Sequence, residues 1–167
     1  ELISLANRHP RINILQPGPG VGGHCIAVDP WFIVSKTPEQ AQMIHTARKV
    51  NDAKPQWVID KVKLAVADFL QANPTKTTKD VTIACYGLAF KPDIDDLRES
   101  PALYITEQIA NFHCGKTVAV EPNVQSIPTH LINKVELLDG LAEGFLHDIS
   151  VVLVAHKEFI NSSLFKN

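Results

Sequence analysis

The sequence is poor in cysteine, in long apolar runs and in excess charge of either sign. Its three cysteines are far apart and form no C-x-x-C pair, which argues against a disulfide framework or a zinc ribbon and favours a reducing, cytoplasmic setting. No apolar run approaches the roughly 18 to 20 residues that cross a bilayer, so no membrane insertion is expected. A net charge of -2 gives no sign of the positive field that nucleic-acid binding needs.

Several ligand-binding signatures are also missing. The seven histidines show neither H-E-x-x-H nor close cysteine spacing, so we expect no metal site. The glycine-rich stretch at 18–23 lacks the G-K-[ST] ending of a P-loop, and Gly87 alone does not make a G-x-G-x-x-G. Asp93-Ile94-Asp95 has the spacing of a D-x-D metal pair, which is weak evidence on its own. There is no initiating methionine, so we expect a piece of a longer chain.

The hydrophobic pattern predicts an α/β protein in which a long central helix precedes a Rossmann-like parallel sheet. Residues 1–74 contain a helix tail, an extended segment at 11–15, the glycine loop, a short helix from Cys25 to Ser35 and helical periodicity over 38–70, with a kink expected near Pro55. Residues 75–167 contain four apolar runs separated by helical stretches. The predicted strands are 81–86, 117–120, 135–138 and 149–155, and the predicted helices are 100–112 and 141–146.

Cys25 is the first candidate for chemistry. Four of the eight glycines fall within 18–23, directly before it, and such clusters are typical where backbone approaches a ligand. A thiolate at the start of a helix is stabilised by the helix dipole, so Cys25 is a candidate nucleophile, the alternative being an inert buried cysteine. Asp29, four residues later, could position water or be a simple first-turn acid. Cys85 and Cys114 are expected to be structural.

A second candidate site follows the first predicted strand, at 87–101. In open parallel sheets, ligands bind beyond the carboxyl ends of the strands. Lys91 and Arg98 supply positive charge there, although a charged surface loop is the plain alternative. Ser100-Pro101 is a good helix start.

Three motifs, taken in order, resemble the nucleotide-sugar dehydrogenases, which oxidise UDP-glucose, GDP-mannose and related sugars to uronic acids. The motifs are G-G-H-C-I-A-V-D-P at 22–30, A-R-K-V-N-D at 47–52 and G-L-A-F-K-P-D-I-D-D-L-R-E-S-P at 87–101. Ala27, where many relatives have proline, makes the chain most similar to the bacterial branch that oxidises UDP-N-acetyl-D-mannosamine.

The resemblance implies a reaction in two steps that uses two NAD per turnover. The primary alcohol of the UDP-sugar becomes an aldehyde, Cys25 adds to form a thiohemiacetal, and a second hydride loss gives a thioester that water hydrolyses. Asp29 matches the aspartate that positions this water. The product would serve polysaccharide biosynthesis in the cell envelope.

The resemblance also assigns binding roles. Phe90 and Lys91, with Gly22 and Gly23, match the substrate site. Arg98 matches an arginine of the NAD cleft, and Arg11 one that reaches the sugar of a neighbouring subunit. The central helix corresponds to the element that builds a homodimer.

The NAD-binding N-terminal domain of the family is absent from this sequence, so we expect the fragment to bind a UDP-sugar weakly, to dimerise and not to turn over alone. Three alternatives stay open. The chain could be a noncatalytic nucleotide-sugar-binding and dimerisation module, or a dehydrogenase of another UDP-sugar. A cysteine hydrolase would need a histidine base, and the sequence places none for that role.

Overall fold

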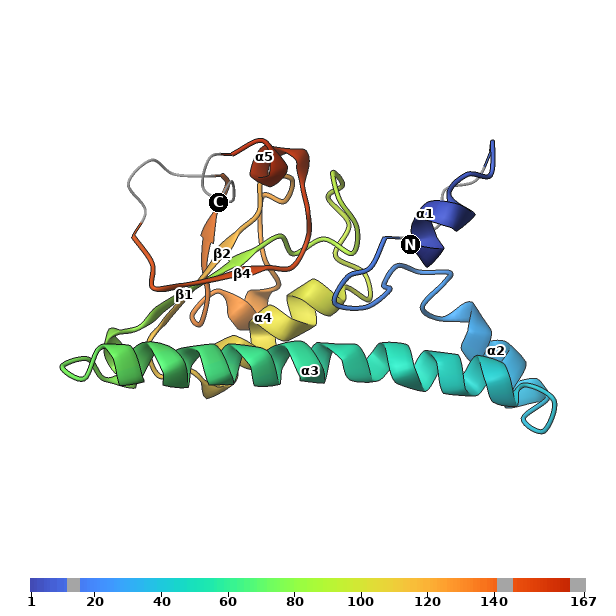
Figure 1. Cartoon of the computed structure of the whole chain (residues 1–167), viewed down its shortest axis with the longest axis horizontal. Coiled ribbons are helices and arrows are strands. Elements are labelled where there is room, and N and C mark those ends of the chain that lie inside the picture. Colours follow the sequence, from blue (N-terminus) through green and yellow to red (C-terminus); the bar gives the residue numbers. More distant parts are fainter. Residues whose placement is uncertain (12–15, 141–145, 163–167) are drawn as a thin grey trace.

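A computed structural model describes residues 1–11, 16–140 and 146–162 of the chain. Figure 1 shows one long helix running beneath the whole molecule, with the sheet above one half and the N-terminal segments above the other. The helices and strands are α1 (Leu2–Ala6), α2 (Asp29–Lys36), α3 (Gln42–Ala72), η1 (Thr78–Asp80), β1 (Thr82–Tyr86), α4 (Pro101–Phe112), β2 (Lys116–Val120), η2 (Thr129–Leu131), β3 (Glu136–Leu138), β4 (Ile149–Val152) and α5 (Lys157–Ile160).

The four strands form one parallel sheet in the order β3-β2-β1-β4. The central strand β1 pairs along its whole length with β2, from Thr82 opposite Lys116 to Tyr86 opposite Val120. Its apolar run is buried on both faces, as expected of an inner parallel strand. The Rossmann-like α/β prediction is therefore confirmed, with each strand within two residues of its predicted start and β4 ending earlier than predicted. Most of the predicted helix at 141–146 and most of the extended segment at 11–15 lie outside the described residues.

The main core lies between the sheet and two helices. Ile83 and Cys85 of β1 point toward α3 and α4, where they pack with the buried side of each helix. The α3 residues of this cluster are Ile59, Val62 and Val66, and the α4 residues are Ala102, Ile105 and Ile109. On the opposite face of the sheet, a smaller cluster packs Tyr86 and Val120 against Phe159 of α5.

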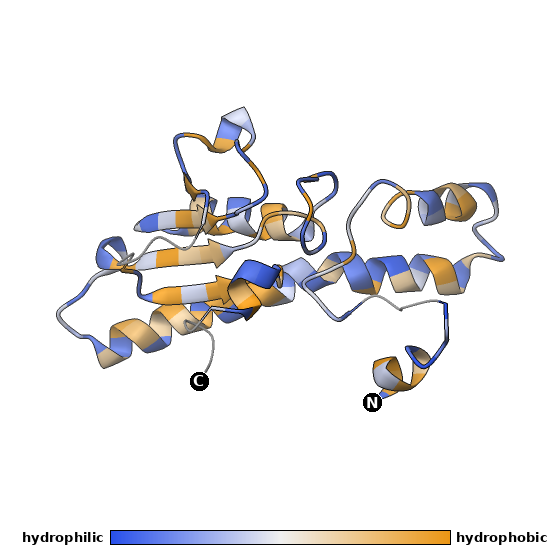
Figure 2. Cartoon of the chain, turned by 90° about the horizontal axis from the view of Figure 1, so that it is seen from above, coloured by the Kyte–Doolittle hydropathy of each residue, from blue (hydrophilic) through white to orange (hydrophobic). Residues whose placement is uncertain are grey.

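The long helix α3 is continuous over 31 residues and contains Pro55. The sequence predicts a kink at this proline; Figures 1 and 2 show α3 as one long helix, and the kink stays a prediction. Pro55 is buried in the packed face of α3, and the contacts of that face support the helix on both sides of the ring. Among the described residues, no helix combines the length and apolarity that a membrane crossing requires.

Candidate functional site

The Cys25 thiol is exposed and lies in a turn that leads into α2. The carbonyl oxygen of Cys25 accepts hydrogen bonds from the backbone N–H groups of Val28 (3.1 Å) and Asp29 (2.8 Å). The helix itself begins only at Asp29, so the predicted helix start at Cys25 was wrong. Pro30 explains the difference, because proline is favoured in the first turn of a helix. The thiol therefore lies one turn before α2, and Asp29 is exposed close after it.

The glycine loop docks on the loop that follows β1. Gly22 is buried so closely that a Cβ there would meet the carbonyl oxygen of Glu99 and would lie 2.8 Å from Phe90 Cβ. Gly23, with a φ of 87°, donates its N–H to the carbonyl oxygen of Arg98 (3.1 Å), and a Cβ there would lie 3.0 Å from the Phe90 ring. Two segments that are more than 60 residues apart in sequence thus form one surface, and the predicted substrate residues Gly22, Gly23 and Phe90 lie together on it.

Arg98 is a positively charged residue near the thiol turn. Its guanidinium donates through Nε to Oδ1 of Asp96 (3.0 Å) and through Nη2 to Oδ2 (2.6 Å), and this partner lowers the pKa of Asp96 to about 2. The same hydrogen bonds raise the pKa of Arg98, and attraction to the Cys25 thiolate adds to that rise. Arg98 is exposed, so its charge remains available to a ligand.

The loop between β1 and α4 is tied down at both ends. Lys91 is exposed at its tip, with Nζ 5.6 Å from the centre of the Phe90 ring. Asp93 and Glu99 both adopt left-handed backbone, with φ of 61° and 49°, a conformation that is costly for residues other than glycine and that clusters at functional sites. Ser100 caps α4 as predicted: its hydroxyl accepts from the Leu103 N–H (3.3 Å) and donates to the carbonyl of Leu88 (2.6 Å).

Arg11 is the predicted site residue that the structure does not bring to this surface. It follows α1 and is exposed, and its backbone N–H bonds to His9 Nδ1 (3.3 Å). Figure 1 shows α1 on the side of the molecule away from the sheet. Its role toward a neighbouring subunit stays a prediction.

The A-R-K-V-N-D motif of α3 holds the thiol segment on both sides of Cys25. Asn51 Oδ1 accepts the backbone N–H of Val21 (2.9 Å), and Arg48 Nη1 donates to the carbonyl oxygen of Ile26 (3.4 Å). Arg48 is buried and is paired with Asp52 (2.6 Å). The motif was visible in the sequence, but its contacts with the loop were not predicted because nothing local links residue 51 to residue 21.

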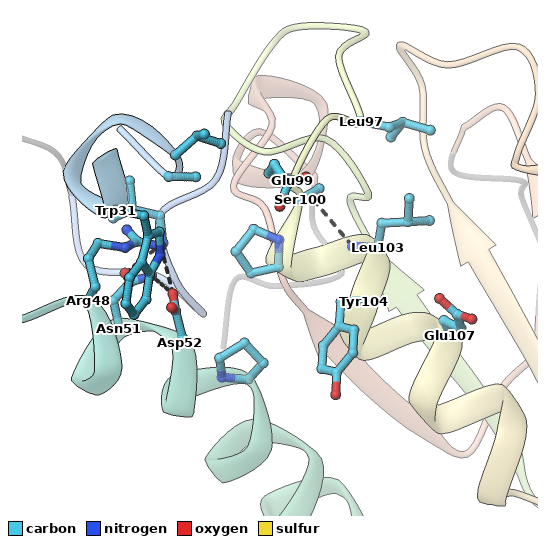
Figure 3. A pocket seen from close by; sticks show the side chains of 15 residues that line it. Trp31, Arg48, Asn51, Asp52, Leu97, Glu99, Ser100, Leu103, Tyr104 and Glu107 are labelled. Carbon is cyan, nitrogen blue, oxygen red and sulfur yellow. Dashed lines mark hydrogen bonds and ion pairs between the residues drawn. The ribbon is translucent and has the colours of Figure 1, made fainter. Parts of the chain in front are cut away.

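Two cavities lie beside the glycine loop and the loop that follows β1. One cavity of about 550 Å³ lies between the thiol segment, α3 and α4, and Figure 3 shows Arg48, Asn51, Glu99 and Tyr104 around it. The second hollow, of about 780 Å³, lies at the carboxyl edge of the sheet and is lined by residues 95–98 and 123–126. The second is where ligands of open parallel sheets bind, and it includes Arg98.

Solved structures with the same arrangement define the class of protein. A UDP-N-acetyl-mannosamine dehydrogenase from Staphylococcus aureus superposes with a TM-score of 0.68 at 37% identity, over 97% of this chain and 35% of the other. A UDP-D-ManNAc dehydrogenase from Pyrococcus horikoshii gives 0.66 at 32% identity over the same shares. A UDP-glucose dehydrogenase from Pyrobaculum islandicum, at 16% identity and a TM-score of 0.66, shows the same fold. The fold is thus that of the nucleotide-sugar oxidoreductases.

Family models narrow this class. Residues 84–166 match the UDP-binding domain of the UDP-glucose/GDP-mannose dehydrogenase family, and residues 1–53 match its central domain. The chain belongs to the UDP-glucose/GDP-mannose dehydrogenase family. It is 62% identical over 159 residues to the UDP-N-acetyl-D-mannosamine dehydrogenase of Yersinia pestis and 60% identical over 162 residues to that of Escherichia coli K12. It covers 38% of the length of each of these relatives, and the match covers 95% of this chain.

Proposed function

We propose that the chain is part of an NAD-dependent UDP-N-acetyl-D-mannosamine 6-dehydrogenase, and that it supplies the nucleophile and the nucleotide-sugar contacts. One observation carries the proposal: the glycine loop docks on Phe90, which places the exposed Cys25 thiol near Arg98 and beside the loop that bears Lys91. A nucleophile and a cationic ligand loop from distant segments thereby face one surface. Another UDP-sugar as substrate, or a noncatalytic binding module, are the competing functions.

The sheet of this chain does not fit NAD in the way a dinucleotide-binding unit does. The loop after β1 has Gly87 alone, and its N–H groups at Leu88 and Ala89 already donate to the carboxylate of Glu121 (2.7 and 3.2 Å). A pyrophosphate would need such N–H groups free. NAD would accept the two hydrides when bound elsewhere in the whole protein, and Arg98 is the residue of this chain that we assign to its cleft.

Cys25 forms and later releases the covalent bond to the sugar. Its sulfur attacks the aldehyde carbon and forms a thiohemiacetal, whose oxidation leaves a thioester. Water then adds to the thioester carbon, the C–S bond breaks, and the carboxylate and the free thiol result. The Cys25 thiol is exposed, so its sulfur is open to an incoming aldehyde. Asp29, on the turn that closes on the Cys25 carbonyl, is the proposed residue for positioning the water.

Lys91 and the glycine loop hold the substrate. The Lys91 ammonium is exposed at the tip of its loop, where it can neutralise a diphosphate as a point charge. Phe90 packs under Gly22 and Gly23, so the backbone of the glycine loop is kept at a fixed distance from Lys91. This arrangement supports the binding of a UDP-sugar between the two loops.

Thiol labelling tests the nucleophile. Iodoacetamide labelling of the chain, followed by mass spectrometry, should modify Cys25 faster than Cys114, which is also exposed but lies at the far end of α4. UDP should slow the labelling of Cys25 and leave that of Cys114 unchanged. Equal labelling of both cysteines would favour the noncatalytic module.

We also propose that α3 pairs with a second copy of the chain. Its exposed side carries large apolar residues at intervals of seven positions, which are Met43, Val50, Trp57 and Leu64. This spacing keeps them on one stripe, as at helix-to-helix seams, and Trp57 is 53% exposed. Trp57→Glu should convert a dimer to a monomer in light scattering, whereas Gln56→Glu, on the adjacent polar side, should not. A wild-type monomer at high micromolar concentration would contradict the proposal.

A further inference from the structure

A buried carboxylate lies at the carboxyl end of β2, directly beneath the proposed substrate loop. Glu121 is fully buried, and its oxygens accept hydrogen bonds from the backbone N–H groups of Leu88 (2.7 Å), Ala89 (3.2 Å) and Asn123 (2.9 Å). The imidazole of His156, also fully buried, lies 3.1 Å from the Glu121 carboxylate through Nε2. Neither residue touches the thiol or belongs to the motifs that carry the family resemblance.

The contacts of His156 define which nitrogen carries its proton. Nδ1 accepts the backbone N–H of Asp93 (2.9 Å) and lies 3.1 Å from the side-chain amide of Asn123. Because His156 Nδ1 accepts hydrogen bonds from both groups, it carries no proton. The ring hydrogen is therefore on Nε2, where it points at Glu121. The ring therefore forms a bridge between the carboxylate and Asp93.

This bridge holds the substrate loop on both sides of Phe90 and Lys91. Glu121 binds the loop at residues 88 and 89, and His156 binds it at residue 93, so the two proposed ligand residues lie between fixed points. Asp93 is also in left-handed backbone, and its carboxylate accepts the N–H of Lys157 (3.0 Å). A strained residue of this kind persists only where its surroundings hold it in place.

Burying a charged carboxylate beside an imidazole is costly. Burial raises the pKa of Glu121, but the hydrogen bonds from His156 and from the N–H groups of Leu88 and Asn123 outweigh it and lower the pKa to about 2. The carboxylate is thus charged in the interior at neutral pH. An apolar residue of similar volume could not accept the N–H groups of Leu88 and Ala89, so the pair favours a role in specifying one loop geometry.

We propose that Glu121 and His156 are positioning residues that set the place of Phe90 and Lys91 for nucleotide-sugar binding. The inference rests on the proposed function of those two residues. It predicts that loosening the bridge weakens the binding of UDP beyond any effect of lost stability.

The test uses two variants that each remove one hydrogen bond between a buried histidine and the backbone. His156→Gln can keep the contact with Glu121 but loses the one with Asp93 N–H. His113→Asn loses the contact of His113 Nε2 with the carbonyl of Val81 (2.8 Å), at the opposite edge of the sheet. Both are assayed in the whole chain at a temperature where each is folded.

The readouts are UDP affinity by calorimetry and hydrogen exchange of residues 87–98. His156→Gln should weaken UDP binding by about 5- to 10-fold, which corresponds to the free-energy contribution of one buried hydrogen bond. It should also speed hydrogen exchange in residues 87–98. His113→Asn should leave both as in the wild type. If His156→Gln does not fold, Glu121→Gln replaces it, with the same expectation.

The results distinguish a failure of the positioning role from a failure of the proposed function. Unchanged binding in His156→Gln, or equal weakening in His113→Asn, would show that the bridge only supports the fold. A wild-type chain that does not bind UDP would overturn the proposed function and the positioning role with it.

Discussion

Replacing Gly22 with alanine probes the contact on which the proposed site depends. A Cβ at this position meets the carbonyl oxygen of Glu99 and lies 2.8 Å from Phe90 Cβ and 2.9 Å from Pro101 Cδ. The Glu99 oxygen belongs to the backbone, Phe90 Cβ is attached directly to it, and Pro101 Cδ is part of a ring. None of these atoms can therefore move aside by a simple side-chain rotation. Overpacking of this kind costs about 1 to 3 kcal/mol, and we expect Gly22→Ala to lower the free energy of unfolding by about that amount.

The measurement is urea denaturation followed by tryptophan fluorescence, with Gly18→Ala as the matched control. Gly18 belongs to the same loop, but a Cβ there has nothing within 4 Å. The control should be neutral or slightly more stable, because alanine restricts the unfolded chain by up to about 1 kcal/mol. If both variants have the same stability as the wild type, the glycine loop does not pack on Phe90 as described. Cys25 and Lys91 would then not share a surface.

Three further predictions concern the contacts around the site. Arg48→Met removes the ion pair with Asp52 and one anchor of the thiol segment, so thermal unfolding should show a loss of about 1 to 3 kcal/mol, and the Cys25 labelling rate should change; an unchanged rate would mean that the anchor is dispensable. The folded pKa of Glu121 lies below its ordinary value of 4.5, so the stability that it contributes is present above pH 4.5 and is lost as pH falls toward about 2. Urea midpoints measured over this range should fall less steeply for Glu121→Gln than for the wild type, and parallel curves would refute this. Asp148→Asn weakens the hydrogen bonds with Lys76 (2.6 Å) and with the Thr82 N–H (2.8 Å) at the start of β1, so calorimetry should show a loss of about 1 to 2 kcal/mol, whereas an unchanged melting temperature would contradict it.

The strands were predictable because inner parallel strands have a simple signature. Residues 83–86 are buried on both faces of the sheet, so their sequence is a continuous apolar run. The long helix was predictable for a similar reason, since its buried positions recur with helical period. The start of α2 was misplaced although Pro30 favours a helix start at Asp29, because the segment from Cys25 forms a turn whose hydrogen bonds were not predicted.

The candidate residues were easier to name than to place. Cys25, Lys91 and Arg98 stood out from their neighbours in the sequence, but their shared surface depends on the packing of Gly22 against Phe90. Glu121 carried no local signal, because an acidic residue after an apolar strand is more often a solvated end than a buried carboxylate. Its burial follows from the N–H groups of a loop more than 30 residues earlier.

The continuity of α3 has a consequence for the geometry of the whole site. The helix is 31 residues long, or about 45 Å at 1.5 Å per residue. Its first half holds the thiol segment through Asn51, and its second half packs on the sheet through Ile59 and Val62. One residue inserted between these two sets would turn one against the other by about 100°. The helix therefore sets both the separation and the rotational register of the nucleophile relative to the nucleotide domain.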